Sequence, residues 1–364
     1  MRCLYLSFTL TVLFLGSTAC EKIEGPDNST TASYDDTPYT LNHGSLPPPP
    51  IATDNLLTEQ TVRLGRMLFY DTRLSGDNTI SCASCHNQAN AFSDTAQFST
   101  GILGFKGGRQ AMAVFNMAYN TNDFFWDGRA QLLREQSLMP IQDSLEMHET
   151  LPNVVAKLEA TSLYRNQFIR AFGSDEINSE KISLALEQFM NSIVSYNSKF
   201  DQFLAGTASL TPSEQRGRRL YFQEYNPFFP DSSGADCAHC HGGANFENHT
   251  YANNGLDIFQ NQTDLGRERV TGNPLHRAQF KVPSLRNIEL TPPYMHDGRF
   301  NSLEEVVEHY NSGIQPSPSL DITLENTRMT GLMLTAQDKL DLVAFLKTLT
   351  DESLSSDTRY SSPF

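Results

Sequence analysis

The stretch Cys82-Ala-Ser-Cys85-His86 and its counterpart Cys237-Ala-His-Cys240-His241 decide the fold of this 364-residue chain. In a CxxCH sequence the two thiols can bond the two vinyl groups of one haem, and the adjacent histidine supplies the proximal iron ligand. A zinc half-site or a thioredoxin-like redox pair also uses CxxC, but two pairs that are each followed directly by histidine favour haem. His239, inside the second motif, is interpreted as a bystander. The sequence therefore predicts two covalent haem c groups, one held by Cys82, Cys85 and His86 and the other by Cys237, Cys240 and His241.

The sequence before the two motifs repeats itself. Leu57-Thr58 and Arg66-Met-Leu-Phe-Tyr70 precede the first motif, and Leu210-Thr211 and Arg218-Arg-Leu-Tyr-Phe222 precede the second. Each copy is typical of a helix followed by a loop that carries the CxxCH sequence. In the second copy Thr211 is followed by proline and then by a glutamate at the third position, which is a strong signal for the start of a helix.

A second pair of matching segments follows the motifs. Trp126-Asp-Gly-Arg129 is echoed by His296-Asp-Gly-Arg299, and each is preceded by an asparagine, Asn116 or Asn287. An internal duplication explains both echoes. We therefore expect two tandem cytochrome c-like domains, each with one covalent haem: an N-terminal domain over residues 53–205 and a C-terminal domain over residues 206–364.

The fold is expected to be mainly α with long loops, because no run of the sequence shows sustained strand alternation. Apolar periodicity and capping signals predict further helices over Leu132–Met139, Leu151–Phe172, Ser179–Leu204, Leu303–Tyr310 and Thr335–Leu349. Loops this long are uncommon in compact domains. A haem explains the long loops, because its large apolar surface gives them a hydrophobic core to pack against that the chain itself does not provide.

The N-terminus is typical of an export signal over residues 1–19, in which Arg2 precedes a short apolar run and then small residues. The run is too short to cross a bilayer, which takes roughly 20 residues. Cys20 follows directly and resembles the lipidated cysteine of a bacterial lipoprotein, although Ser17 stands where such signals usually carry leucine. Ordinary cleavage near Ala19 is the alternative. We expect a periplasmic protein that is held at a membrane only by a lipid anchor.

Residues 20–52 are rich in Asp, Ser, Thr and Pro and lack apolar periodicity, which indicates a disordered, partly extended tether. Apart from Cys3 and Cys20, every cysteine belongs to a CxxC pair, so no thiol is left for a structural disulfide. The net charge of −15 argues against nucleic acid or anionic lipid as a partner. An acidic body suits a basic or neutral redox partner.

Four segments of the chain are distinctive: Cys82–His86, Phe125–Arg129, Pro283–Asn287 and Pro293–Gly298. Together they resemble the bacterial dihaem cytochrome c peroxidase and MauG family, and the resemblance runs over residues 57–349. It implies two cytochrome c domains that face each other. It also implies that residues 53–205 form the peroxidatic domain, whose haem binds peroxide, and that residues 206–364 form the electron-transfer domain, whose haem relays electrons.

The resemblance assigns roles to residues near the first haem. Trp126, the only tryptophan, matches the family residue that passes electrons between the haems; the alternative is a core aromatic before a turn. Gln136 and Glu146 match the polar pair on the open side of the peroxide-binding haem, where a carboxylate can move protons during O–O cleavage. Pro140 matches a further pocket residue. Without the resemblance, Glu146 would be interpreted as a surface carboxylate at a helix end.

The resemblance also implies one calcium ion between the domains. Thr291 and Pro293 match positions whose backbone carbonyls bind it, and hard oxygen ligands suit Ca²⁺. The third family position is an asparagine after an arginine. Here Gln110 follows Arg109, so the amide oxygen is kept on a longer arm.

One departure from the family pattern lies after the first motif. Many family peroxidases have a histidine there that caps the resting iron until the other haem is reduced. The next histidine after His86 is His148, and Ile102 occupies the aligned position. An apolar side chain cannot bind iron, so we expect an open first haem that needs no reductive activation.

A second departure concerns the distal ligand of the second haem, which is methionine in the family peroxidases. The aligned residue is Tyr310, as in MauG-like members, with His309 and Met295 as rival ligands. Adjacent residues on a helix point about 100° apart, so only one of His309 and Tyr310 can face the iron. Phenolate ligation favours ferric iron and should lower the reduction potential.

The leading hypothesis is an enzyme that reduces hydrogen peroxide to water with electrons from a small cytochrome c or a copper protein. The first alternative is a MauG-like enzyme that uses peroxide to oxidise a protein substrate; Ile102 and Tyr310 favour it. A second alternative is a dihaem electron carrier without catalysis, which Gln136 and Glu146 argue against.

Overall fold

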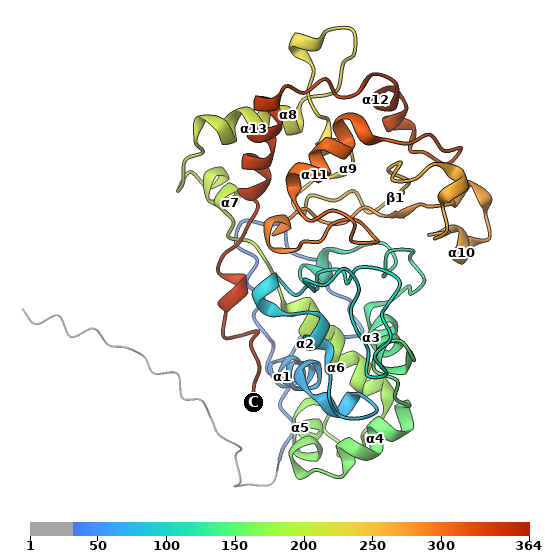
Figure 1. Cartoon of the computed structure of the whole chain (residues 1–364). Coiled ribbons are helices and arrows are strands. Elements are labelled where there is room, and N and C mark those ends of the chain that lie inside the picture. Colours follow the sequence, from blue (N-terminus) through green and yellow to red (C-terminus); the bar gives the residue numbers. More distant parts are fainter. Residues whose placement is uncertain (1–31) are drawn as a thin grey trace, which may run out of the picture. The chain divides into compact units, whose positions relative to one another are not determined.

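The computed structural model describes residues 32–364, which are mainly helical (Figure 1). The expected export signal and Cys20 lie outside the described residues. The helices are α1 Glu59–Tyr70, α2 Cys82–Cys85, α3 Leu133–Gln142, α4 Leu151–Glu159, α5 Ser162–Phe172, α6 Ser179–Ser192, α7 Lys199–Leu204, α8 Pro212–Phe222, α9 Cys237–Cys240, α10 Glu268–Thr271, α11 Leu303–Glu308, α12 Glu325–Thr330 and α13 Ala336–Lys347. Strands β1 (Tyr251–Ala252) and β2 (Phe280–Lys281) pair antiparallel. Within residues 32–364, no helix is long and apolar enough to cross a membrane.

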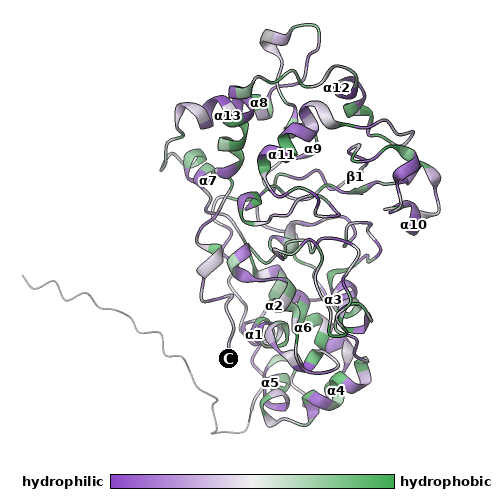
Figure 2. Cartoon of the chain, in the orientation of Figure 1, coloured by the Kyte–Doolittle hydropathy of each residue, from purple (hydrophilic) through white to green (hydrophobic). Residues whose placement is uncertain are grey.

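Two hydrophobic cores organise the described residues. The first gathers α1, α5 and α6 with the loops around the first CxxCH motif. The second gathers α8, α11 and α13 around the second motif. Hydrophobic and hydrophilic residues alternate along surface helices such as α4 (Figure 2), which buries Val154 and Leu158.

The two cores repeat one helix crossing. Helix α1 crosses α6 at Gly65, where a side chain would collide with the backbone carbonyl of Ala185. Helix α8 crosses α13 at Gly217, where a side chain would collide with the carbonyl of Asp341. Glycine lets the two backbones touch in both places. The duplication expected from the sequence is therefore visible in the packing of the helices.

The segments after the two motifs are also repeated. Asn116 and Asn287 are buried, both have a left-handed backbone, and each begins a short 3-10 turn. Further on, a β-bridge closes each Asp-Gly-Arg turn, with Gly128 and Gly298 at positive φ (+71° and +61°). Both sequence echoes thus correspond to equal local structures.

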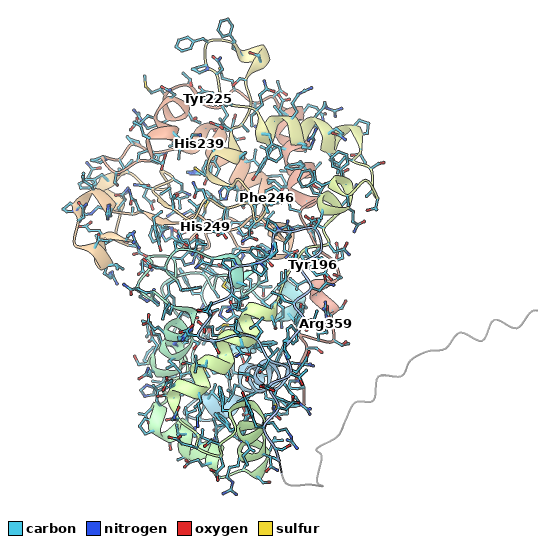
Figure 3. All side chains as sticks on the ribbon, turned by 180° about the vertical axis from the view of Figure 1, so that it is seen from behind. Tyr196, Tyr225, His239, Phe246, His249 and Arg359 are labelled. Carbon is cyan, nitrogen blue, oxygen red and sulfur yellow. The ribbon has the colours of Figure 1, made fainter. Side chains whose placement is uncertain are left out.

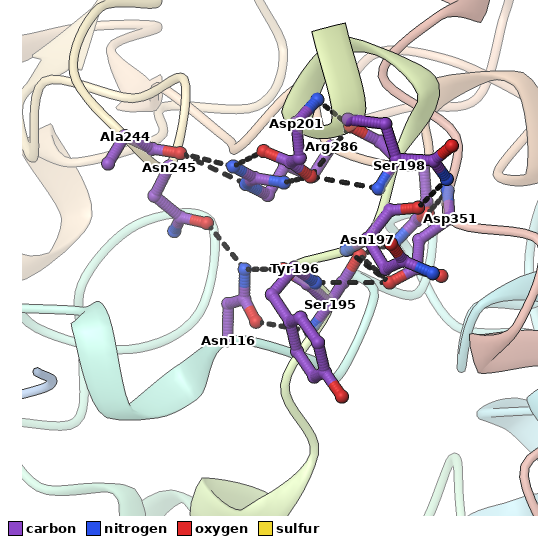
Figure 4. A network of polar contacts seen from close by, with 12 residues as sticks. Asn116, Ser195, Tyr196, Asn197, Ser198, Asp201, Ala244, Asn245, Arg286 and Asp351 are labelled. Carbon is purple, nitrogen blue, oxygen red and sulfur yellow. Dashed lines mark hydrogen bonds and ion pairs between the residues drawn. The ribbon is translucent and has the colours of Figure 1, made fainter. Parts of the chain in front are cut away.

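A polar network ties both repeats to the segment between α6 and α7 (Figure 4). The Ser195 N–H donates to Oδ1 of Asn116, and Nδ2 of Asn287 donates to the Ser195 hydroxyl. The next two backbone N–H groups, of Tyr196 and Asn197, both donate to Oδ2 of Asp351. These contacts take the N–H groups that a helix would need. The single helix predicted over 179–204 is therefore wrong, and α6 and α7 are separate.

Two other helix predictions also need correction. The helix expected over 151–172 is interrupted at Thr161, whose side chain accepts from the Tyr164 N–H and starts α5. The helix expected over 303–310 ends at Glu308 and continues as a π-helical turn, His309–Gly313. The predicted starts at Thr211 and Thr335 are confirmed, since both residues cap their helices with a capping box.

Residues 32–52 are not a disordered tether, contrary to the prediction from composition. The Asp35 N–H donates to the Arg170 carbonyl, and the Tyr39 N–H donates to the Leu57 carbonyl. Leu46 is buried, and Tyr39 and Ile51 pack against the first core. A few apolar residues spaced among prolines are enough to hold this extended segment on the folded body. Residues 20–31 of the expected tether lie outside the described part of the chain.

The C-terminal tail packs on the first core, although the expected boundary assigned all of 206–364 to the second domain. Leu354 and Tyr360 are buried in the first core. Gln88, just after the first motif, donates through Nε2 to the carbonyls of Leu354 and Asp357 at 3.0 and 2.8 Å. Beside Tyr360, Arg359 lies against Tyr196 (Figure 3). The tail therefore completes a core that belongs mostly to the first repeat.

Candidate active site

Both CxxCH motifs line one cavity of about 950 Å³. Helix α2 carries Cys82 and Cys85, and helix α9 carries Cys237 and Cys240. The four thiols are free, so all of them are available to form thioethers. Most of the other lining residues are apolar, as a haem requires of its pocket.

The two motif histidines are oriented in the same way. Nδ1 of His86 lies 3.1 Å from the carbonyl oxygen of Phe92, and Nδ1 of His241 lies 3.0 Å from that of Pro283. A carbonyl only accepts hydrogen bonds, so Nδ1 carries the proton and Nε2 keeps its lone pair for a metal. Burial lowers the pKa of both histidines, that of His241 to about 4, which keeps the rings neutral.

This donor set fits haem better than zinc. Within residues 32–364, no three His, Cys, Asp or Glu side chains gather where they could share one ion. Each motif instead presents two thiols and one imidazole along the wall of an apolar cavity. The residues therefore fit two haems, each with an axial nitrogen ligand from His86 or His241.

The predicted polar pair lies on the cavity wall of the first repeat. Helix α3 carries Gln136 and Pro140, and the loop after it carries Glu146; all three line the cavity. Burial raises the pKa of Glu146, with Asp143 adding to the effect and Arg129 opposing it. A smaller pocket of about 320 Å³ adjoins the cavity and shares Glu146 with it. Glu146 is therefore no ordinary surface carboxylate.

The loop that could cap the first haem presents no histidine. Gly101 lines the cavity, whereas Ile102 is turned aside and its N–H donates to the Glu146 carbonyl at 2.9 Å. His148 does not line the cavity either. The loop thus holds the backbone of Glu146 instead of offering a ligand.

Trp126 lies on the wall of the same cavity as both motifs. Its ring Nε1 donates to the Gln110 carbonyl at 2.8 Å, and its own carbonyl accepts from the Lys281 N–H at 2.7 Å. Gln110 belongs to the first repeat and Lys281 to the second. The first repeat therefore holds the indole of Trp126, and the second repeat holds its backbone.

The three residues expected to bind calcium all line the cavity, from opposite repeats. Gln110 comes from the first repeat, and Thr291 and Pro293 come from the second. Nε2 of Gln110 donates to the Ser93 hydroxyl at 3.0 Å, so its amide oxygen is the atom that remains for a cation. All three residues line the same cavity, and calcium binding by them stays a prediction.

The three candidates for the distal ligand of the second haem differ in whether they line the cavity. Tyr310 and Met295 line the cavity, and His309 does not. Nε2 of His309 lies 3.0 Å from the Asn254 carbonyl. Burial raises the pKa of the Tyr310 phenol to about 12. Both His309 and Tyr310 lie in the π-helical turn that follows Glu308. Such turns often occur at functional sites.

Sequence reasoning missed an ion network next to Trp126. Arg109 pairs with Asp264 through Nε at 2.7 Å and with Asp127 through Nη1 at 2.8 Å. Despite burial, this pairing lowers the pKa of Asp264 to about 2. The pair joins the first repeat to the second, and its residues are too far apart in sequence for any pattern to signal it.

Comparison with known proteins gives consistent matches. The family model for di-haem cytochrome c peroxidase matches residues 59–209. The methylamine utilization protein MauG of Methylorubrum extorquens is 36% identical over 302 residues, covering 82% of this chain and 80% of its own length. Cytochrome c551 peroxidase of Nitrosomonas europaea is 36% identical over 294 residues, covering 79% of each chain.

Solved structures agree with these sequence matches. A MauG-like protein associated with microbial copper homeostasis superposes with a TM-score of 0.77 at 36% identity, covering 87% of this chain and 97% of its own. The dihaem peroxidase BthA of Burkholderia thailandensis has a TM-score of 0.70 at 24% identity, covering 91% of this chain and 96% of its own, and supports the fold alone.

Proposed function

Because the chain belongs to the dihaem cytochrome c peroxidase family, which includes MauG, we propose that it is a periplasmic enzyme that reduces hydrogen peroxide to water. The reaction takes up two electrons and two protons and gives two water molecules. One observation carries the proposal: a half-buried carboxylate, Glu146, lies on the wall of the cavity that Cys82, Cys85 and His86 also line.

The residues divide the work between the two repeats. When bound, the haems supply the redox chemistry: one breaks the O–O bond and the other stores and passes electrons. Glu146 takes a proton from the near oxygen of peroxide and returns it to the departing oxygen. Gln136 orients the peroxide by hydrogen bonding, and Trp126 offers an electron path between the repeats. Ile102 leaves the first site open without prior reduction.

The electron donor is proposed to be a small basic cytochrome c or copper protein that docks near Cys240. Burial raises the pKa of the Cys240 thiol to about 11, and the charges of Asp321 and Asp236 add to the rise, so two carboxylates stand beside this edge of the cavity. Phe228 and Phe229 project from the adjoining loop with 85% and 67% of their surface exposed. Exposed phenylalanines near two carboxylates suit a partner whose docking surface is surrounded by basic side chains.

Tyr225 and His239 mark this face of the second repeat (Figure 3). Both line the cavity, and the Tyr225 hydroxyl bonds the Thr330 hydroxyl of α12. The loop before the second motif and helix α12 are thereby joined into one surface beside the cavity. Electrons would enter the protein here.

A second candidate function is the MauG-like oxidation of a protein substrate. Tyr310 on the cavity wall favours it, as do the 36% identities to MauG and to the MauG-like structure. The two functions differ in what supplies the electrons, a small carrier or a residue of another protein. Reaction with peroxide in the presence of co-purified proteins, followed by mass spectrometry of those proteins, separates them.

The remaining proposals concern location and calcium. An export signal ending before a lipidated Cys20 would place the chain in the periplasm at a membrane surface. One Ca²⁺ would be bound by Gln110, Thr291 and Pro293 between the repeats. Intact mass of the natural protein tests the first, and metal analysis with chelation tests the second.

The central experiment measures two quantities on the purified protein. Haem-stained denaturing gels and intact mass should show two covalently attached haems. Reduced small cytochrome c should then be oxidised on addition of hydrogen peroxide, without a reductive pre-treatment. One haem, or none, would refute the proposal, as would a protein with two haems that does not turn over peroxide with any reduced carrier.

A further inference from the structure

Asn254, in the turn after β1, contacts all three rivals for one position. Its side-chain Nδ2 lies 3.3 Å from Sδ of Met295 and 3.4 Å from the hydroxyl of Tyr310, and it donates to both. Its backbone carbonyl accepts from Nε2 of His309 at 3.0 Å. The sequence names these same three side chains as rival distal ligands of the second haem, and of the three only Met295 and Tyr310 line the cavity.

The contact with the backbone carbonyl of Asn254 excludes His309 as an iron ligand. Because a carbonyl oxygen can only accept, Nε2 of His309 carries a proton and has no lone pair for iron. The opposite nitrogen, Nδ1, faces the backbone of Gly313 in the π turn. The ring is therefore held outside the cavity by Asn254.

The contacts of the Asn254 side chain favour Tyr310 over Met295 as the ligand. A thioether sulfur is a weak acceptor, so Met295 gains little from the amide. An oxygen bound to ferric iron carries negative charge, and a hydrogen bond to a charged oxygen is roughly twice as strong as one to a neutral group. A donor beside a buried charged oxygen also offsets part of its desolvation cost. The same N–H group thus stabilises Tyr310 at the iron more than it stabilises Met295.

The backbone of Asn254 is held firmly enough to make this selection. Its neighbour Asn253 is buried and donates through Nδ2 to the hydroxyls of Ser317 and Ser319 at 3.3 and 3.0 Å. Oδ1 of Asn253 accepts from the Gly255 N–H at 2.9 Å. Gly255 has a φ of +68° and packs against Ile314 so closely that no side chain would fit. The turn is therefore fixed on both sides of Asn254.

We propose that Asn254 is the positioning residue that selects Tyr310, over Met295 and His309, as the distal ligand of the second haem. This inference rests on the proposed dihaem function and deepens it. Asn254 itself makes no contact with peroxide in this scheme. It sets the reduction potential of the second haem by deciding which atom reaches the iron.

The test is the variant Asn254→Leu, which keeps the side-chain size and removes the hydrogen bonds. Met295 is then released to compete with Tyr310. A thioether favours ferrous iron more than a phenolate does. The equilibrium constant for reducing the second haem should rise at least tenfold, which is about 59 mV for one electron. Spectroelectrochemical titration measures the potential, and EPR of the ferric protein should show a second low-spin species.

The double variant Asn254→Leu/Met295→Leu distinguishes a loss of ligand selection from a general disturbance of the haem site. With no thioether to bind, the potential should return to the wild-type value or below it. Gln260→Leu replaces an exposed amide of the same repeat and should change neither measurement. An unchanged potential in Asn254→Leu overturns the inference, and so does a rise that persists in the double variant.

Failure of the underlying ligand assignment gives a different result. Tyr310→Phe should raise the potential strongly if Tyr310 is the ligand. If Tyr310→Phe leaves the potential and the EPR spectrum unchanged, Tyr310 is not the ligand, and the inference about Asn254 falls with it. Haem content and peroxide turnover, measured on the same samples, report separately on the proposed function.

Discussion

The two repeats of the molecule share a scaffold and differ in what faces the open side of each motif. Both close a helix crossing on a glycine, Gly65 or Gly217, and both fix the motif histidine through a backbone carbonyl. In the first repeat a half-buried carboxylate, Glu146, lines the cavity. In the second, Tyr310 and an amide face it. Under the proposed function, one architecture serves peroxide chemistry in the first repeat and electron storage in the second, and a few cavity-lining side chains make the difference.

The largest expected effect comes from removing one motif at a time. Cys82→Ala/Cys85→Ala should remove the first haem and abolish the reaction with peroxide. Cys237→Ala/Cys240→Ala should remove the second haem and leave a protein that reacts with peroxide once but accepts no electrons from a carrier. Intact mass counts the haems, and stopped-flow mixing follows the two reactions. Equal defects in the two variants would contradict the division of labour.

Glu146→Gln should give the next largest effect. Glutamine keeps the size and removes the base, so O–O cleavage should slow by about 10²- to 10⁴-fold. Binding of peroxide should be little affected. Rapid-mixing kinetics under single-turnover conditions measure the cleavage rate, and Glu159→Gln, an exposed carboxylate at the end of α4, is the matched control. A wild-type cleavage rate would return Glu146 to a structural role.

Trp126→Phe should break the link between the repeats without damaging either one. Phenylalanine keeps an aromatic ring but loses the hydrogen bond to the Gln110 carbonyl and is harder to oxidise. The first reaction with peroxide should keep its rate, and electron delivery from the second haem should become limiting. Multiple-turnover and single-turnover rates from one preparation distinguish the two steps. A proportional loss in both would indicate that Trp126 acts on the peroxide site itself.

The glycine crossings offer a smaller and purely structural comparison. Gly65→Ala and Gly217→Ala force a methyl group into a neighbouring backbone, and overpacking of this kind typically costs about 1–3 kcal/mol of stability. Denaturant unfolding measures the loss. Gly108→Ala is the control, because a side chain there would meet no neighbour. If the crossings are equivalent, both variants should lose similar amounts, and a large difference would show that one repeat tolerates separation of its helices.

The smallest expected effect is on pH dependence. Burial raises the pKa of Glu146 above its usual 4.5, and the base is lost when the carboxylate is protonated. The rate of peroxide cleavage should therefore fall on acidification, and its midpoint should lie above 4.5. The Glu146→Gln variant should lack this inflection. A midpoint at or below the usual value would place the carboxylate in open water.

The sequence alone predicted the parts of this structure that depend on short spacings. The two CxxCH motifs, the duplication around them and the helix starts at Thr211 and Thr335 all appear as expected. The family resemblance placed Trp126, Gln136 and Glu146 on one cavity, which no periodicity would have done, since these residues lie on different elements.

What could not be predicted depends on contacts between distant residues. The break between α6 and α7 is imposed by Asn116 and Asp351, which satisfy the backbone from far along the chain. Residues 32–52 appeared disordered by composition, because their few apolar side chains find partners only on a folded surface. No sequence pattern pointed to Asn254 as a functional residue, because asparagine is common in turns for reasons of backbone conformation alone.

The tail that completes the first core has a consequence for maturation of the protein. Leu354 and Tyr360 follow the rest of the first core by about 160 residues of sequence, so the first core cannot be completed before residue 360 has been made. Most N-terminal domains fold before the rest of their chain is made. In this chain the first core depends on a later segment than the second core does, since the second core contains no residue beyond Leu349. Gln88, three residues after Cys85, can form its contacts with the carbonyls of Leu354 and Asp357 only once this tail has been made and docked.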